Sequence, residues 1–150
     1  MAGISQSHAL EELCLAQNGA NPLKKILVID DQQSIRMILS MLLSDMGYVV
    51  EVGQNGEEGI QLFNDHSDIA LVITDIRMPK MDGNEVARHI RASYRANTPL
   101  VAITGFPDEA QVNLFDYRLV KPFKLETLRG IVARLEAIDS PKPQALGSRL

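Results

Sequence analysis

Short runs of apolar and β-branched residues alternate with helix-like patterns from Lys25 onward, and this alternation most constrains the fold. The runs cover residues 25–29, 48–52, 69–74, 100–103 and 119–120. Strands that alternate with helices build a parallel sheet with helices on both faces. The run at 69–74 is almost wholly apolar, as expected for a central strand that is buried on both sides. The sequence therefore predicts an α/β fold with five strands.

Apolar residues at three- and four-residue spacing predict the helices between these strands. The first helix carries Ile35, Ile38, Leu39, Leu42 and Met46, with Gly47 as its C-cap. A short second helix covers 56–63, with Ile60 and Phe63 on one side. The third helix carries Val86, Ile90 and Tyr94, and the last carries Leu125, Leu128, Ile131, Val132 and Leu135. Residues 107–116 are poorly patterned, so a regular helix is not expected there.

The chain of 150 residues has room for about one domain of ordinary size. We expect this domain at 24–138, after an N-terminal extension at 1–23 and before a C-terminal tail at 139–150. The tail is Pro-rich and weakly apolar, which predicts disorder. The extension is expected to float free or to dock on the domain through Leu10, Leu13 and Leu15; if it docks, deleting residues 1–22 should lower the melting temperature.

Net charge, cysteine count and the length of apolar runs exclude several classes of protein. With 15 Lys and Arg against 19 Asp and Glu, the net charge is −4, which argues against binding nucleic acid or anionic lipid. Cys14 is the only cysteine, so no disulfide can form within the chain. No apolar run approaches the roughly 18–20 residues that span a bilayer, and the first residues lack the pattern of a secretory signal. We therefore expect a cytoplasmic protein with no membrane span.

Five polar residues follow the predicted strands: Asp30 and Asp31 after the first, Asp75 after the third, Thr104 after the fourth and Lys121 after the fifth. Ligands bind at the carboxyl ends of the strands in an open parallel sheet. Each residue alone has an ordinary explanation, such as an N-cap or a solvated surface group. Together, however, three neighbouring carboxylates would repel one another unless a cation neutralised them.

The ligand types favour Mg²⁺ as this cation. Carboxylate oxygens suit Mg²⁺, and the three histidines, His8, His66 and His89, lie away from these strand ends, so zinc is not indicated. A carboxylate can attack phosphorus to form an aspartyl-phosphate, and Asp75, alone on the central strand, is the candidate nucleophile. Lys121 could pair with the phosphoryl oxygens as a point charge, and Thr104 could donate its hydroxyl.

These residues resemble the receiver domains of two-component response regulators over about 25–138. The shared motifs are VIDDQQS with its acidic pair, TDIRMPKMDG around Asp75, and the late Lys-Pro-Phe that begins at Lys121. The resemblance implies a flavodoxin-like, doubly wound five-stranded parallel sheet in the order 2-1-3-4-5. It also implies a cis peptide bond between Lys121 and Pro122.

The resemblance further implies roles for individual residues. Asp75 would accept a phosphoryl group from a phosphohistidine on a sensor histidine kinase or a histidine phosphotransfer protein. Asp30, Asp31 and Asp75 would hold Mg²⁺ with the backbone carbonyl of Arg77, and Thr104 and Lys121 would bind the phosphoryl oxygens. The chain would then be no enzyme beyond its own phosphorylation and dephosphorylation.

Two departures from the family pattern fall in the second half of the chain. Lys121 follows Thr104 by only 17 positions, so the fourth helix is expected to be short or irregular. The Thr104-Gly105-Phe106 ending resembles a subset of receivers with such a reduced helix. Arg118 occupies the position where most receivers place a switching aromatic residue; it is either part of the switch or a surface arginine packed on the sheet edge. We expect activation to be relayed from Thr104, Gly105 and Phe106 through residues 105–117.

The sequence leaves the output of this receiver-like domain open. Nothing after 138 is long enough for a DNA-binding or catalytic domain, so we expect a stand-alone protein that signals through contacts with an unknown protein target. A phosphoryl shuttle or sink, a dimerising regulator and a phosphate-independent binding module are alternatives. A phosphatase of the haloacid-dehalogenase type is disfavoured because its second Asp, two positions after the nucleophile, is replaced here by Arg77.

Overall fold

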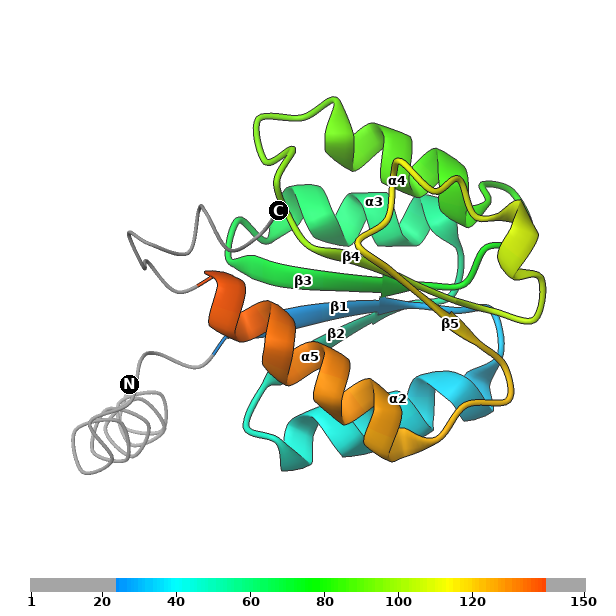
Figure 1. Cartoon of the computed structure of the whole chain (residues 1–150). Coiled ribbons are helices and arrows are strands. Elements are labelled where there is room, and N and C mark those ends of the chain that lie inside the picture. The colour runs from blue at the N-terminus through cyan, green and yellow to red at the C-terminus, as the bar shows by residue number, and fades with distance from the viewer. Residues whose placement is uncertain (1–23, 140–150) are drawn as a thin grey trace.

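The computed structural model describes residues 24–139, which contain a five-stranded parallel sheet (Figure 1). The strands are β1 (Lys25–Ile29), β2 (Val49–Gly53), β3 (Ile69–Thr74), β4 (Leu100–Thr104) and β5 (Tyr117–Val120). Their order is β2-β1-β3-β4-β5, and every neighbouring pair is parallel. The predicted flavodoxin-like topology is confirmed.

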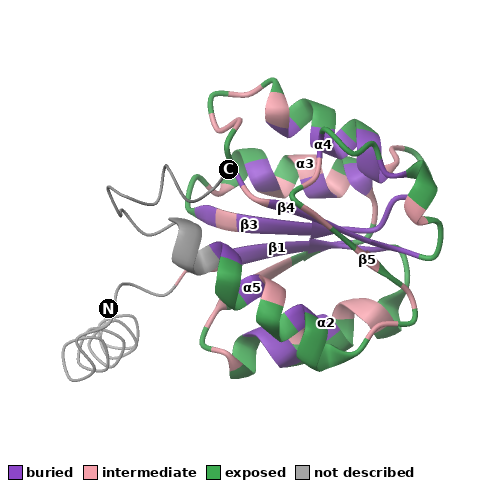
Figure 2. Ribbon diagram, in the orientation of Figure 1, coloured by how far each residue is buried: buried purple, intermediate pink, exposed green. Residues whose placement is uncertain are grey.

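Helices cover both faces of this sheet. Helices α2 (Gln33–Asp45) and α5 (Leu125–Asp139) lie on one face, and α3 (Gly56–Asp65) and α4 (Gly83–Arg91) lie on the other (Figure 1). Buried residues concentrate along the central strands and on the helix sides that face them, as Figure 2 shows. The sheet therefore separates two apolar cores, and its carboxyl ends stay open between the helix layers.

Each core combines alternate residues of the strands with the inner stripes of two helices. The α2–α5 side contains Ile26, Val28, Leu39, Leu42, Leu43, Leu71, Ile73, Val101, Ile103, Leu128, Val132 and Leu135. The α3–α4 side contains Leu27, Ile29, Phe63, Ile69, Val72, Val86, Ala87, Ile90, Leu100 and Leu114. This alternation is what a parallel strand covered on both faces requires.

Several helix details differ from the sequence prediction. Tyr94 was wrongly placed on the third helix: α4 ends at Arg91, and the Tyr94 side chain is 88% exposed. Ile38 and Leu125 belong to their helices but are exposed, whereas Leu43, absent from the predicted stripe, is fully buried. The C-cap of α2 is Met46, and Gly47 follows it with a positive φ of 98°. Periodicity alone therefore did not predict where each helix ends or which of its apolar residues are buried.

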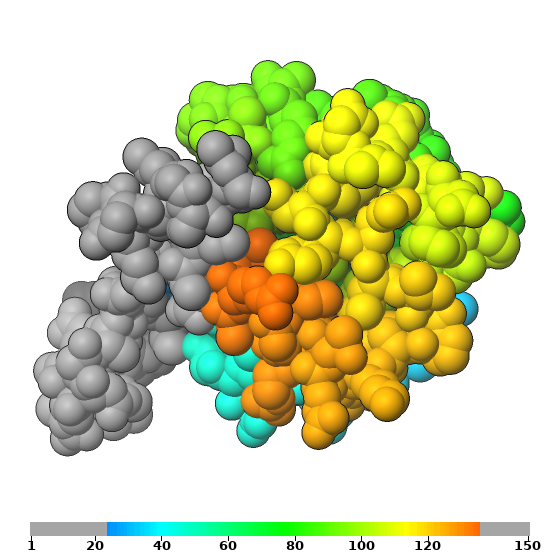
Figure 3. Space-filling view, viewed as in Figure 1, coloured from blue at the N-terminus to red at the C-terminus, as the bar shows by residue number. Residues whose placement is uncertain are grey.

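The connection between β4 and β5 contains a single turn of 3-10 helix, η1 (Pro107–Glu109). This confirms the prediction of a reduced fourth helix. The yellow and yellow-green atoms of this connection lie at the surface in Figure 3, between green α4 and orange α5. Its short length lets Asp116 return directly to β4, where the Asp116 N–H donates to the Leu100 carbonyl at 2.8 Å.

The predictions for residues 1–23 and for most of the tail lie outside the described residues. Within the described range, none of the helices is long and apolar enough to cross a membrane.

Candidate functional site

Asp30 follows β1 and is held by three backbone or side-chain contacts. Its N–H donates to the Gly53 carbonyl at 3.1 Å, its carboxylate accepts from the Gln32 N–H at 2.9 Å, and its carbonyl accepts from the Arg36 guanidinium at 2.7 Å. Asp30 is 1% exposed, whereas its neighbour Asp31 is exposed. The acidic pair thus presents one buried and one open carboxylate at the sheet edge.

Asp75 follows the central strand β3 and is 7% exposed. Its N–H donates to the Ile29 carbonyl at 2.9 Å, which ties it to the end of β1. One carboxylate oxygen accepts from the Ile76 N–H at 2.7 Å, and the Thr74 hydroxyl donates to the Asp75 carbonyl at 2.8 Å. The backbone therefore fixes where the Asp75 carboxylate lies.

The start of α4 packs directly against this carboxylate loop. Asp82 caps the helix: its side chain accepts from the Glu85 N–H while the Glu85 side chain accepts from the Asp82 N–H, both at 2.9 Å. The Gly83 N–H donates to the Ile76 carbonyl at 2.8 Å, and a Cβ on Gly83 would overlap the Asp75 carbonyl oxygen. In the MDG motif, Asp82 therefore caps α4, and Gly83 lets the start of α4 lie close to the Asp75 backbone.

Lys121, after β5, joins the two buried aspartates. Its ammonium group donates to Asp30 and to Asp75, at 3.0 Å each, and to the Gln32 side chain at 3.3 Å. The Lys121 N–H donates to the Thr104 carbonyl at 2.9 Å, and the Lys121–Pro122 peptide bond is cis. Residues 91 positions apart therefore meet at one edge of the sheet.

The charges of this cluster influence one another. Burial raises the pKa of Asp30, and the nearby Asp75 carboxylate raises it too, so that the Gln32 and Lys121 hydrogen bonds only partly offset the increase. Burial lowers the pKa of Lys121, but its hydrogen bonds to Asp30 and Asp75 outweigh this and leave the pKa raised. Lys121 therefore stays an ammonium ion, and it is the only cation within ion-pair distance of the two buried aspartates among the described residues.

The donor set of the cluster fits a divalent cation with oxygen ligands. One carboxylate oxygen from each of Asp30, Asp31 and Asp75 lies within 4.8 Å of the others. Mg²⁺ takes such oxygens and keeps several waters, so the open side at Asp31 suits it. The proposed role of the Arg77 carbonyl stays a prediction.

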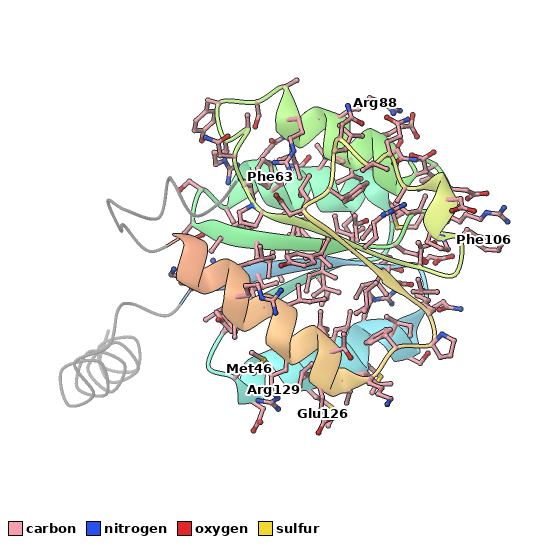
Figure 4. The ribbon with its side chains drawn as sticks, in the orientation of Figure 1. Met46, Phe63, Arg88, Phe106, Glu126 and Arg129 are labelled. Atoms are coloured by element: carbon pink, nitrogen blue, oxygen red, sulfur yellow. The ribbon has the colours of Figure 1, made fainter. Side chains whose placement is uncertain are left out.

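Thr104, at the end of β4, is fully buried, and its hydroxyl oxygen accepts from the Phe106 N–H at 3.0 Å. Phe106 is 47% exposed and lies at the carboxyl edge of the sheet, where Figure 4 labels it. Arg118 is exposed and donates to the Pro107 carbonyl at 3.2 Å. The structure thus brings Asp30, Asp31, Asp75 and Lys121 together and joins Arg118 to the connection that follows Thr104.

The Arg77 side chain also binds the connection between β4 and β5. Its guanidinium donates to both Glu109 carboxylate oxygens, at 2.8 and 2.5 Å, and lies 3.5 Å from the centre of the Phe106 ring. The hydrogen bond from Arg77 lowers the pKa of Glu109, and the same bond raises the pKa of Arg77. A residue two positions after Asp75 therefore contacts both the start and the middle of the 105–116 segment.

Three residues at this edge were missed in the sequence. Gln32 contacts Lys121, and its place directly after the acidic pair was a usable signal. Asn84 donates to the Glu109 carbonyl at 2.6 Å and accepts from the Gln111 N–H at 2.9 Å. No local pattern reveals Asn84 or Glu109, because their partners lie 25 or more positions away.

Comparisons with known proteins show what the chain is similar to. The family model described as response regulator receiver domain matches residues 26–133. Regulatory protein AtoC of Escherichia coli is 34% identical over 129 residues, which cover 81% of this chain and 27% of that protein. The probable transcriptional regulator ycf27 of Guillardia theta is 38% identical over 122 residues, covering 77% of this chain and 45% of that protein. The chain thus matches about a quarter to a half of the length of these relatives.

Solved structures match over nearly their whole length. The chemotaxis protein CheY4 of Vibrio cholerae has a TM-score of 0.68 and 31% identity, covering 75% of this chain and 98% of that one. The response regulator TrrA of Thermotoga maritima, solved in complex with Mg²⁺ and BeF, has a TM-score of 0.69 and 33% identity, covering 75% and 99%.

Proposed function

Because the chain belongs to the response regulator receiver family, we propose that Asp75 takes up a phosphoryl group and that this change alters contacts with another protein. One observation carries the proposal: a single ammonium group, that of Lys121, lies 3.0 Å from both Asp75 and Asp30. This pairing holds the candidate nucleophile beside a fixed positive charge. The proposed donor is a sensor histidine kinase or a histidine phosphotransfer protein.

The proposed step forms one bond and breaks one. The Asp75 oxygen that pairs with Lys121 attacks phosphorus, and the bond from phosphorus to the donor histidine nitrogen breaks, so that the nitrogen keeps the electron pair. The other Asp75 oxygen stays oriented by the Ile76 N–H. Lys121 then pairs with phosphoryl oxygens, and the buried Thr104 donates its hydroxyl to one of them once it turns from Phe106.

Asp30, Asp31 and Asp75 are the residues proposed to hold Mg²⁺ in this reaction. A bound Mg²⁺ would neutralise charge on the phosphoryl oxygens. Asp30 is already fixed by Gln32 and Arg36, so its carboxylate is in place before any ion arrives. The exposed Asp31 leaves the site accessible from solvent. A cytoplasmic protein without catalytic activity on other substrates is part of the same proposal.

The test is incubation of the chain with acetyl phosphate and Mg²⁺, followed by intact mass measurement. We expect a mass gain of one phosphoryl group that disappears in Asp75→Ala and in the presence of EDTA. Asp82→Ala is the matched control, because this nearby aspartate only caps α4 and should leave the mass gain intact. A gain that persists in Asp75→Ala would refute the assignment. Absence of any gain, with a phosphohistidine donor as well, would favour the phosphate-independent binding module.

A further inference from the structure

Helix α2 exposes large apolar side chains beside the edge strand β2. Met37 is 56% exposed, Met41 is 70% exposed, and Val52 of β2 is 41% exposed. They line a groove of about 420 Å³ together with Gln33, Arg36 and Ser40. In Figure 1 this helix is the cyan-blue element beneath β1 and β2. None of the described residues covers the groove, although its methionines are adaptable apolar contacts suited to binding.

We propose that the N-terminal segment of this same chain, residues 1–23, docks in the groove through Leu10, Leu13 and Cys14. Their spacing of three and four positions would place them on one side of a helix, where together they would present an apolar face to the groove. The inference does not depend on phosphoryl transfer.

The point where the segment joins the domain favours this groove. The carbonyl of Lys24 accepts from the Val49 N–H at 2.9 Å, so the segment enters directly beside β2, the strand that contributes Val52. Cys14 precedes Lys24 by ten residues, which reach up to roughly 33 Å when extended. The 13 residues of α2 span only about 20 Å. The segment is therefore long enough to reach Met41.

Charge also favours this groove over a second one. Residues 1–23 contain Glu11 and Glu12 and no Lys or Arg, and the groove's only charged lining residue is Arg36. The second groove lies across α2, beside Ile38 and Leu125, and its charged lining residue is Lys121. Lys121 is already paired with Asp30 and Asp75. An acidic segment therefore finds a more available cation in the first groove.

The sole cysteine supplies the test in the full-length chain. Because Cys14 lies on the proposed docking face, its thiol should react more slowly with a soluble aromatic disulfide than the thiol of a free peptide of residues 1–23. We expect a rate about tenfold lower, which corresponds to a docked population of roughly nine-tenths. Equal rates in chain and peptide would overturn the proposal. Slowing that grows with chain concentration would also overturn it, in favour of a contact between two copies.

Substitutions then locate the contact. Met41→Glu should restore the peptide rate, because a charge in the groove disfavours the apolar face; at 70% exposure this change should not disturb the fold. Val112→Glu, a matched change at a valine that is 69% exposed on the β4–β5 connection, should keep the slow rate. If Leu125→Glu restores the rate and Met41→Glu does not, the second groove is the docking site and the proposal is wrong. Slow reaction in all three variants would contradict it too.

Discussion

The chain leaves β3 and β4 at the same edge of the sheet, but the two connections are held by different bonds. After β3 the chain turns into α4, whose capping box and backbone hydrogen bonds are local. After β4 it makes only the η1 turn and then runs to β5. The first connection carries the Asp75 loop and the second follows Thr104, so the two sides of the candidate site differ in how they are supported.

Long-range side chains replace the missing helix in the β4–β5 connection. Arg91, at the end of α4, donates to the Leu114 carbonyl of this connection at 3.0 Å and pairs with Asp116 at 3.2 Å. The same guanidinium donates to the Ala96 and Thr98 carbonyls, which precede β4, at 2.6 and 2.7 Å. The Asn84 side chain donates to the Glu109 carbonyl and accepts from the Gln111 N–H. The connection is therefore held by side chains from α4, from the loop after β3 and from β5, and the longest helix within it is the single η1 turn.

Removing the Arg91 side chain should have the largest effect on stability. Arg91→Ala leaves the Ala96, Thr98 and Leu114 carbonyls, on both sides of β4, without their donor, which should cost about 2–4 kcal/mol in the free energy of unfolding. Urea denaturation measures this loss. Arg88→Ala is the control, because Arg88 lies on the outer side of the same helix (Figure 4) and its change should stay within about 0.5 kcal/mol. Equal losses would show that the connections before and after β4 do not depend on Arg91.

The second largest effect comes from placing alanine at one glycine in each connection, because the two substitutions should differ in their effect on stability. Gly83→Ala pushes a methyl group into the Asp75 carbonyl, so it should cost about 1–3 kcal/mol and slow phosphorylation by acetyl phosphate. Gly105→Ala meets no atom within 4 Å, so it should change stability by no more than about 0.5 kcal/mol. Thermal denaturation of both variants checks this. A costlier Gly105→Ala would contradict the contrast between the two connections.

Asn84→Ala should increase amide exchange in the β4–β5 connection by more than its effect on global stability explains. It removes two hydrogen bonds to the backbone, worth about 1–2 kcal/mol together. Amide exchange at residues 109–111 should become faster, while exchange in β1 and β3 changes only as global stability does. Asn64→Ala, at an exposed position on α3, is the control that should leave the loop unchanged. Unaltered amide exchange at residues 109–111 in Asn84→Ala would show that the Asn84 side chain does not hold this part of the connection.

The smallest effect concerns the Arg77–Glu109 pair. Because its hydrogen bond to Arg77 lowers the pKa of Glu109, the carboxylate is favoured in the folded chain. The pair is therefore complete above the ordinary glutamate value of 4.5 and is lost as the pH falls through the lowered pKa. Carbon NMR of the Glu109 carboxyl should titrate below 4.5, and Arg77→Ala should bring the midpoint back to that value. A midpoint unaffected by Arg77→Ala would contradict the pairing.

Much of the fold was predictable because its signals are local. The apolar run at 69–74 gave β3 with the bounds that the structure shows, and Asp30, Asp31 and Asp75 could be grouped because parallel strands end at one edge. The 17-position spacing between Thr104 and Lys121 correctly predicted the reduced fourth helix.

The failures are those of contacts between distant residues. Tyr94 fits a helical period with Ile90, but α4 ends at Arg91, where the arginine side chain turns back to bind loop carbonyls. Periodicity says nothing about such a stop. Asn84 and Glu109 likewise have partners that only the folded chain brings together. The support of the β4–β5 connection was therefore the part that the sequence could not predict.

The most direct test of this account is amide hydrogen exchange with and without phosphorylation at Asp75. If Thr104 turns toward the phosphoryl group, the Phe106 N–H loses its acceptor, so exchange at residues 106–116 should change most. Exchange in β1 and β3 should hardly change, because their ladders do not involve this connection. A mass gain at Asp75 with unchanged exchange at 106–116 would contradict the proposed relay.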